Sequence, residues 1–368
     1  MNHFILRLVS DAAHKLRLDE IIGQRYKGAG SIIFGHSVVQ SRTDAVDSDL
    51  QLSIGFLELL LRHYIANRID IISLDESFER LSTGNKRQFI CFTFDDGYRD
   101  NLTSVLQLFK KYASPFAVYV TTAFLERRFD YWWAPLREVL RRHNEDIFIV
   151  GGRRFLTSTP QQKRRTFHTI CRNIGNLKID VKEINHFCRR KGVTEEQMLD
   201  RDALKPSELK VLSEDPLVEI GGHTETHRNL AQLTLDDARA DILRNQCYLE
   251  RLIGKEVRHF AYPYGDADSC GEREFALCRE LGFRSAATAR LGGLFTEHLI
   301  HNTSLPRIRF FGGCESIGLI ECQRNGAIGA IQSRLGSPII MTAGEPVGTV
   351  AFRDRRAISR TVRRGDAH

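Results

Sequence analysis

Short apolar runs alternate with amphipathic segments along most of the chain. The runs are rich in β-branched and aromatic residues and end at Gly, Pro or polar residues, which is typical of buried strands. They predict strands at 31–39, 69–73, 89–94, 115–121, 217–222, 257–262, 283–288 and 305–311. Between them, apolar residues spaced three or four positions apart predict helices at 50–66, 75–81, 101–113, 234–252 and 271–281. This alternation favours an α/β layer or barrel over a sandwich.

Three parts of the chain depart from the alternation. Residues 3–22 predict a helix packed on the domain, with adsorption to an anionic bilayer as the alternative. Residues from about 125 to 205 predict an insertion with a hairpin and charged helices, in which we expect Trp132 and Trp133 to close a core rather than to stack on a ligand. Residues 312–368 give a weaker pattern, and their arginine-rich end is expected to be poorly ordered.

Charge and cysteine usage narrow the class of protein. The formal charge is +7, and residues 353–368 alone hold six Arg against two Asp, so the body is only mildly basic and we expect no nucleic-acid partner. The eight cysteines include no Cys-x-x-Cys pair, which favours reduced thiols over a disulfide framework.

The N-terminus and the hydropathy of the chain give an expectation for its location. Arg7 and Asp11 interrupt the N-terminal apolar stretch before a signal peptide's core can form. No segment reaches the ~18 apolar residues of a transmembrane helix. We therefore expect a cytoplasmic protein, either free or in peripheral contact with a membrane.

Three strand ends carry residues that suit catalysis. The strand 89–94 ends in Asp95-Asp96-Gly97, where adjacent carboxylates repel unless they stay solvated or a cation lies between them. The strand 217–222 is followed by His223 and His227, and histidines four apart on a helical turn can share one ion, which a single Asp completes. The third run, 258–265, begins with an arginine and ends in Pro-Tyr-Gly. Each motif alone is weak evidence, since an Asp-Asp-Gly is more often a solvated turn.

Taken in order, the three motifs resemble those of the polysaccharide deacetylases of the NodB-homology type, carbohydrate esterase family 4. The resemblance implies an α/β fold with a distorted (β/α) barrel. We expect an N-terminal helix in 1–30, the barrel in 31–311 with its helical insertion at about 125–205, and a C-terminal extension in 312–368. The implied activity is a hydrolase that removes N-acetyl groups from an amino-sugar-containing oligo- or polysaccharide.

The resemblance also implies roles for individual residues. Asp96, His223 and His227 would bind a divalent metal, expected to be Zn2+, with metal-bound water as the nucleophile. Asp95 would be the base, kept ionised by the metal and by Arg258, and a backbone N–H near Tyr264 would stabilise the oxyanion.

Two histidines compete for the role of general acid. His301 fits the family's C-terminal Leu-x-His, but it lies in a polar stretch where the family has an apolar strand. His36 ends the strand 31–39, as in family members whose acid precedes the Asp-Asp motif, although Gly35 replaces the usual aromatic residue. We prefer His36. Among lower-ranked residues, Leu305-Pro306-Arg307 resembles a family strand whose arginine contacts either the site or an acidic neighbour.

Two other functions fit the same motifs. A catalytically weak carbohydrate-binding protein on this scaffold would explain the departures at the acid position, although the intact ligand set weighs against it. An amidase acting on a small non-sugar C–N bond is the other alternative. The sequence does not predict the sugar or the oligomeric state.

Overall fold

The computed structural model describes residues 3–332, apart from 42–45, 47–49, 86, 144, 151, 174–179 and 311–314, together with residues 337 and 339. Its centre is an eight-stranded sheet in the order β11-β10-β9-β6-β5-β1-β12, with β4 paired to β5, and all these pairings are parallel. The strands are β1 Gly30–Gly35, β4 Asp70–Ile71, β5 Phe89–Phe94, β6 Phe116–Val120, β9 Val218–Gly222, β10 His259–Ala261, β11 Ser285–Ala287 and β12 Ile308–Arg309.

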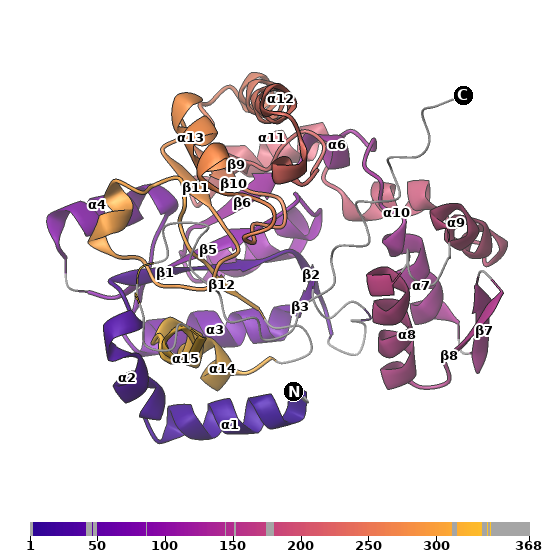
Figure 1. The fold of residues 1–368 in the computed structure, drawn as a ribbon, viewed down its shortest axis with the longest axis horizontal. Helices are drawn as coiled ribbons and strands as arrows, with labels where there is room; N and C mark the ends of the chain where they lie inside the picture. The colour runs from indigo at the N-terminus through magenta and orange to yellow at the C-terminus, as the bar shows by residue number, and fades with distance from the viewer. Residues whose placement is uncertain are drawn as a thin grey trace.

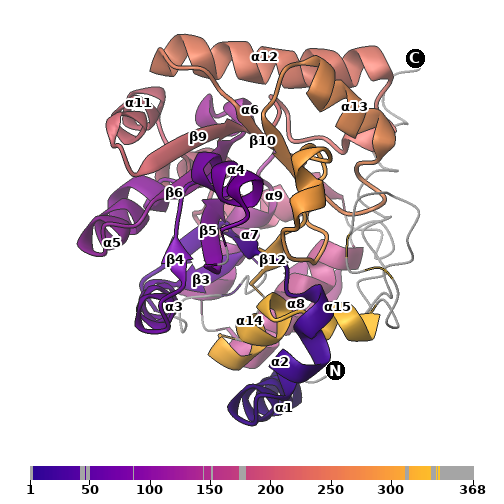
Figure 2. The same cartoon turned by 90° about the vertical axis from the view of Figure 1, so that its left-hand side faces the viewer.

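The sheet curls into part of a barrel with helices on its outside, as Figure 2 shows when the strands are viewed from one side. Every residue of β1, β5 and β6 is buried, because both faces of these strands are covered, and this explains their nearly continuous apolar runs. The prediction of a distorted (β/α) barrel is confirmed. The surrounding helices are α3 Ile54–Ala66, α4 Leu74–Thr83, α5 Leu106–Lys111, α11 Pro206–Glu214, α12 Leu235–Ile253 and α13 Glu272–Glu280.

The insertion forms a lobe beside the barrel (Figure 1). It has its own hydrophobic cluster, in which Trp132 is buried and Trp133 is partly buried, as predicted. The lobe contacts the barrel directly after Asp96, since Arg99 N–H donates to the Asp202 carbonyl and Leu204 N–H to the Gly97 carbonyl. Its elements are α7 Trp133–Arg142, β7 Ile147–Val150, β8 Arg153–Leu156, α8 Pro160–Asn173, α9 Val181–Arg190 and α10 Glu195–Asp202.

The two ends of the described chain pack together along one edge of the barrel (Figure 1). The predicted helix 3–22 is two helices, α1 His3–Lys15 and α2 Leu18–Gly23, because Arg17 adopts a left-handed φ of 56°. They contact α14 Ile317–Arg324 and α15 Ala327–Gln332, so part of the predicted extension is helical. The predicted disorder of the arginine-rich end lies outside the described residues.

None of the helices in the described ranges is long and apolar enough to cross a bilayer.

Short elements complete the fold. They are the strands β2 Ser37–Val39 and β3 Gln51–Ser53, the helix α6 Thr122–Leu125, the π-helix η3 Asn101–Val105, and the 3-10 helices η1 Gln24–Tyr26, η4 Leu230–Gln232 and η5 Thr296–Leu299.

Candidate metal centre and active site

The three predicted metal ligands converge at the C-terminal ends of β5 and β9. Asp96 Oδ1 lies 3.3 Å from His227 Nε2 and 3.5 Å from His223 Nε2, and one ligand atom from each residue lies within 4.8 Å of the others. Parallel strands bring their carboxyl ends to one edge of a sheet, which places residues far apart in sequence around one point. The arrangement is a facial set of two histidines and one carboxylate.

The protonation of His223 fits a bound cation. Its Nδ1 lies 2.7 Å from the Ala261 carbonyl, which can only accept, so we assign the ring proton to Nδ1 and a lone pair to Nε2. Burial lowers the pKa of His223 to about 4, against the opposing effect of Asp95, and this favours the neutral form that metals bind. Asp96 Oδ1, facing that lone pair, is buried and accepts no hydrogen bond from the described residues. Two acceptors therefore face each other, and a cation between them would satisfy both.

A tight bend, and not a helical turn, brings the two histidines together. Thr224 and His227 adopt left-handed φ values of 64° and 56°, and Thr224 Oγ1 accepts a hydrogen bond from His227 N–H at 2.8 Å. Asp241 of α12 fixes the bend by accepting from Glu225 N–H at 2.7 Å and Thr226 N–H at 3.0 Å. The sequence correctly paired the histidines, but the helical geometry assumed for them is wrong.

The backbone at the end of β5 is also unusual. Asp96 has a φ of 79° and Gly97 a φ of 90°. A left-handed non-glycine residue costs free energy and is maintained only when its surroundings fix it. Here the Asp96 carbonyl accepts from Thr121 N–H, and a side chain at Gly97 would also meet Val120 at 3.2 Å. The turn directs consecutive carboxylates to different partners.

Asp95 is held by Arg307, which is fully buried. Arg307 Nη1 and Nη2 donate to the two Asp95 oxygens at 2.8 Å and 2.9 Å, and its Nε donates to the Thr288 carbonyl at 2.7 Å. The guanidinium also lies 4.0 Å from the ring centre of Phe34. Burial alone would raise the pKa of Asp95, but Arg307, together with His223 and His36, outweighs burial and the pKa is lowered. Asp95 is therefore a carboxylate fixed in one orientation beside the ligand set.

The prediction that Arg258 holds Asp95 is wrong. Arg258 precedes β10 and donates to Asp75 at the start of α4. It lies three residues before Ala261, whose carbonyl contacts His223, so it is about 10 Å back along the strand from the site. Arg307, a lower-ranked candidate from the sequence, holds the Asp95 carboxylate instead.

Asp75, Glu219 and His259 form a second cluster of metal-ligand type near the N-terminal ends of the strands. Arg258 and Arg284 both donate to Asp75, and Leu74 N–H donates to Glu219 at 2.6 Å. Arginine charges and the amino end of α4 thus already compensate the carboxylates, and we interpret the cluster as a structural ion-pair network.

His36 and Tyr264 lie at the same end of the barrel as the metal ligands. His36 follows β1, and its pKa is lowered by burial although the charges of Asp96 and Asp95 oppose this shift. The Tyr264 ring centre lies 5.1 Å from that of His227, and Tyr264 has a left-handed φ of 63°. On the insertion side, the ring centre of Phe129 lies 5.7 Å from that of His227. Phe129 was not predicted, because nothing in its local sequence pattern distinguishes it from aromatic residues of the core.

The structure places His301 away from the ligand set. Asn302, the next residue, donates to the Arg284 carbonyl at 2.8 Å, and residues 302–305 run parallel to β11. His301 therefore precedes this segment at its N-terminal end, on the side where Arg284 binds Asp75.

The Asp100 side chain does not cap the following helix but accepts hydrogen bonds from Ser37 Oγ at 2.8 Å and Asn101 Nδ2 at 3.0 Å. Burial outweighs these bonds and raises the pKa of Asp100 to about 7. A raised carboxyl pKa means that stability falls as pH rises from about 4, the unfolded value, to about 7.

We expect Asp100→Asn, which mimics the protonated form, to raise the free energy of unfolding by about 2 kcal/mol at pH 8 and not to raise it at pH 3.5. This free energy is smaller than the full pKa shift of Asp100 would give, because the Asp100 side chain is partly exposed to solvent. Urea unfolding of both proteins across this range measures the difference. A gain that is the same at every pH would contradict the assignment.

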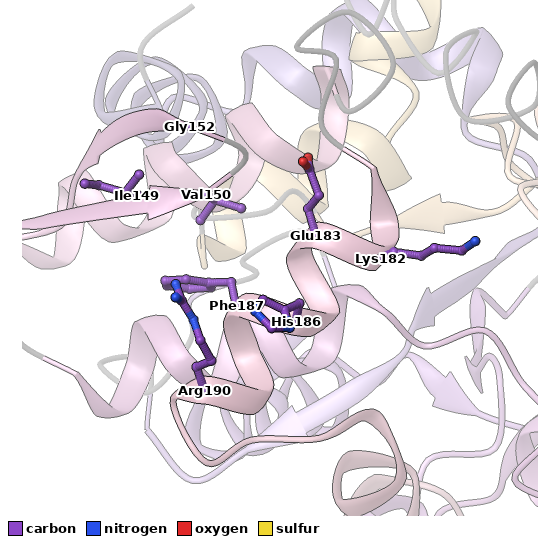
Figure 3. A pocket seen from close by; sticks show the side chains of 8 residues that line it. All are labelled: Ile149, Val150, Gly152, Lys182, Glu183, His186, Phe187 and Arg190. Atoms are coloured by element: carbon purple, nitrogen blue, oxygen red, sulfur yellow. The ribbon is translucent and has the colours of Figure 1, made fainter.

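A pocket of about 400 Å3 lies in the insertion, between β7 and α9 (Figure 3). Ile149 and Val150 line it from the hairpin, and Lys182, His186 and Arg190 line it from successive turns of α9. Its lining includes none of the predicted site residues, so the candidate active site is at the strand ends and not in this pocket.

Comparisons with known proteins agree with the fold and the motifs. The family model described as polysaccharide deacetylase matches residues 82–152 and 157–285, more than half of the chain. The deacetylase PplD of Streptococcus pyogenes, solved in complex with acetate, is similar in structure with a TM-score of 0.51 at 15% identity, over 77% of this chain and 92% of that one. A polysaccharide deacetylase from Bacillus cereus gives a TM-score of 0.51 at 15% identity, over 80% and 68%. The comparison with curated sequences gives no significant match. The chain belongs to the polysaccharide deacetylase family of hydrolases.

Proposed function

We propose that the protein is a metal-dependent hydrolase that removes N-acetyl groups from an amino-sugar-containing oligo- or polysaccharide. One observation carries the proposal: Asp96, His223 and His227 surround a common point, and the adjacent Asp95 is fixed by a buried arginine. Family membership supports the substrate class.

The donor set suits a divalent cation with open coordination positions, and two imidazoles with one carboxylate make Zn2+ the expected metal. Bound there, the cation would act as a Lewis acid and lower the pKa of water. His223 and His227 would hold it through Nε2, and Asp96 through Oδ1.

The remaining residues divide the proton transfers of amide hydrolysis. Asp95 accepts a proton from the attacking water, and Arg307 keeps its carboxylate ionised and oriented. The backbone N–H of Tyr264 stabilises the oxyanion that forms at the carbonyl oxygen of the acetyl group. His36 donates a proton to the departing nitrogen, so that the C–N bond breaks to give acetate and a free amine. Phe129 and Tyr264, whose rings both lie against the ring of His227, limit access of bulk water.

Acetate release from N-acetyl-hexosamine oligomers tests the proposal. The metal-loaded protein is expected to release acetate, a chelator to abolish the release, and added Zn2+ to restore it. Sugar binding without release by the metal-loaded protein would replace the proposal with a carbohydrate-binding function. Release of product only from small non-sugar amides would replace it with an amidase function.

The assignment of His36 as the general acid predicts that substitutions of His36 and His301 affect kcat differently. We expect His36→Ala to lower kcat by about 100-fold or more, because proton donation to the leaving nitrogen is lost. His301→Ala is expected to change kcat less than about threefold, since His301 lies at the other end of β11. Steady-state acetate release measures both variants. A larger loss in His301→Ala would assign the acid to His301.

A further inference from the structure

The N-terminal helices expose an unusual amount of apolar surface. In the part of the chain that the structure describes, sixteen large hydrophobic side chains are exposed, and six of them fall within residues 8–22. Ile21 is 72% exposed and Leu16 68%. Such a concentration usually marks an interaction site, whereas single exposed apolar residues do not. The six, which we call the α1–α2 face, are Leu8, Val9, Leu16, Leu18, Ile21 and Ile22.

Among the residues of these helices whose side chains the structure describes, 7–23, the side that packs on the protein is polar. Ser10 is buried, its carbonyl accepts from Cys322 Sγ, and Asp11 accepts from Ser316 Oγ. Asp19 of α2 is buried and accepts from Asn325 Nδ2 at 2.7 Å. A surface helix of a globular domain normally packs its apolar stripe inward and exposes its polar side. Here the orientation is reversed, so the packing of α1 and α2 on the body does not account for the six apolar residues of the α1–α2 face.

Basic residues neighbour the α1–α2 face in sequence. Arg7, Lys15, Arg17 and Arg25 are exposed. Arg7 pairs with Asp11 and Arg17 with Glu20, while no described acidic residue forms an ion pair with Lys15 or Arg25. A helix with an apolar face and flanking Lys and Arg is typical of binding in the headgroup region of an anionic bilayer.

The basic residues beside the α1–α2 face disfavour two other binding partners for this face, a second copy of the chain and the chain's own C-terminal segment. A second copy placed face to face would bring two sets of these cations together. The chain beyond Gln332 starts from α15, which contacts α2, but residues 333–368 contain seven Arg against three acidic residues and would be repelled as well. An anionic surface attracts both the helices and this segment.

We propose that the α1–α2 face docks on the surface of an anionic lipid bilayer. The helices lie in the headgroup region with their apolar side chains toward the acyl chains, and the barrel remains outside. Docking needs neither the metal centre nor turnover, so it stands or falls independently of the proposed deacetylation.

Vesicle flotation of the full-length protein tests the proposal. The protein is expected to float with vesicles of phosphatidylcholine and phosphatidylglycerol, to bind pure phosphatidylcholine at least tenfold less, and to bind less at high salt. Leu16→Ser/Ile21→Ser is expected to weaken binding to the anionic vesicles about tenfold or more. The matched control Val211→Ser/Leu243→Ser, on α11 and α12 across the molecule (Figure 2), should bind like the unchanged protein.

Circular dichroism should show that the two serine double variants are folded, because their substituted side chains are exposed. Absence of vesicle binding by the unchanged protein, or equal binding by Leu16→Ser/Ile21→Ser, would overturn the proposal. So would a dimer in size-exclusion chromatography that Leu16→Ser/Ile21→Ser converts to a monomer, since the face would then join two copies. If Arg360→Ala/Arg363→Ala/Arg364→Ala alone abolished binding, the C-terminal segment and not the helices would be the membrane contact.

Discussion

Asp95→Asn is expected to lower the rate of acetate release by about 1,000-fold while leaving metal content unchanged. Asn has nearly the same shape and still accepts a hydrogen bond from Arg307 through its oxygen, but it cannot take a proton from water at neutral pH. Asp95 is not among the three converging ligands, so the cation should remain bound. Metal analysis of the purified variant and its kcat, measured on the same sample, give the two quantities.

His223→Ala provides the contrast, because it removes a ligand and should lose both metal and activity. Glu225→Gln is the matched control in the same bend: its side chain pairs with Arg244 and Arg128 and is not a ligand, so it should keep both. Full activity in Asp95→Asn would remove Asp95 from the mechanism. Loss of metal in Asp95→Asn would show instead that Asp95 serves the metal site.

The strand ends were predictable because both their structure and their chemistry are local. Phe89–Phe94 is apolar apart from Thr93, since both faces of β5 are covered, and the abrupt change to Asp95 and Asp96 marks where the strand leaves the sheet. The same change occurs after Gly222. In a parallel sheet such ends meet at one edge, so the convergence of Asp96 with His223 follows from the order of elements.

The partner of Asp95 was not predictable from proximity to a motif. Arg258 belongs to the third motif but precedes its strand, and the start of a parallel strand lies away from the edge where the carboxylates gather. Arg307 lies in the segment that runs along β11 toward that edge, because Leu305 pairs with Ala287. Only the direction and stagger of the strands distinguish the two arginines, and neither can be read from composition or spacing.

The bend at His223 and the helices at 317–332 were missed for a related reason. Asp241, which fixes the bend, comes from α12, so a distant side chain overrides the local preference for a helical turn. In α14 the buried side includes the ion pair of Glu321 with Arg324, and a buried polar pair disrupts the apolar periodicity by which a helix is recognised.

Arg307→Met is expected to reduce the free energy of unfolding by about 3–5 kcal/mol and to lower activity by 100-fold or more. The change leaves the buried Asp95 carboxylate without its counter-charge, and breaking one side of a buried ion pair is strongly destabilising. Arg258→Met removes an arginine that is partly exposed and pairs with Asp75, so it should cost no more than about 1 kcal/mol and leave kcat nearly unchanged. Urea unfolding and acetate release measure the two effects.

The double variant Asp95→Asn/Arg307→Met separates stability from catalysis. With the carboxylate and the guanidinium both removed, no buried charge is left uncompensated, so the double variant should be more stable than Arg307→Met alone. It should remain inactive, because the base is absent. If stability were not recovered, the cost of Arg307→Met would come from the lost contacts to Thr288 and Phe34 and not from Asp95. An activity loss in Arg258→Met equal to that in Arg307→Met would contradict the assignment of Arg307 as the residue that positions the base.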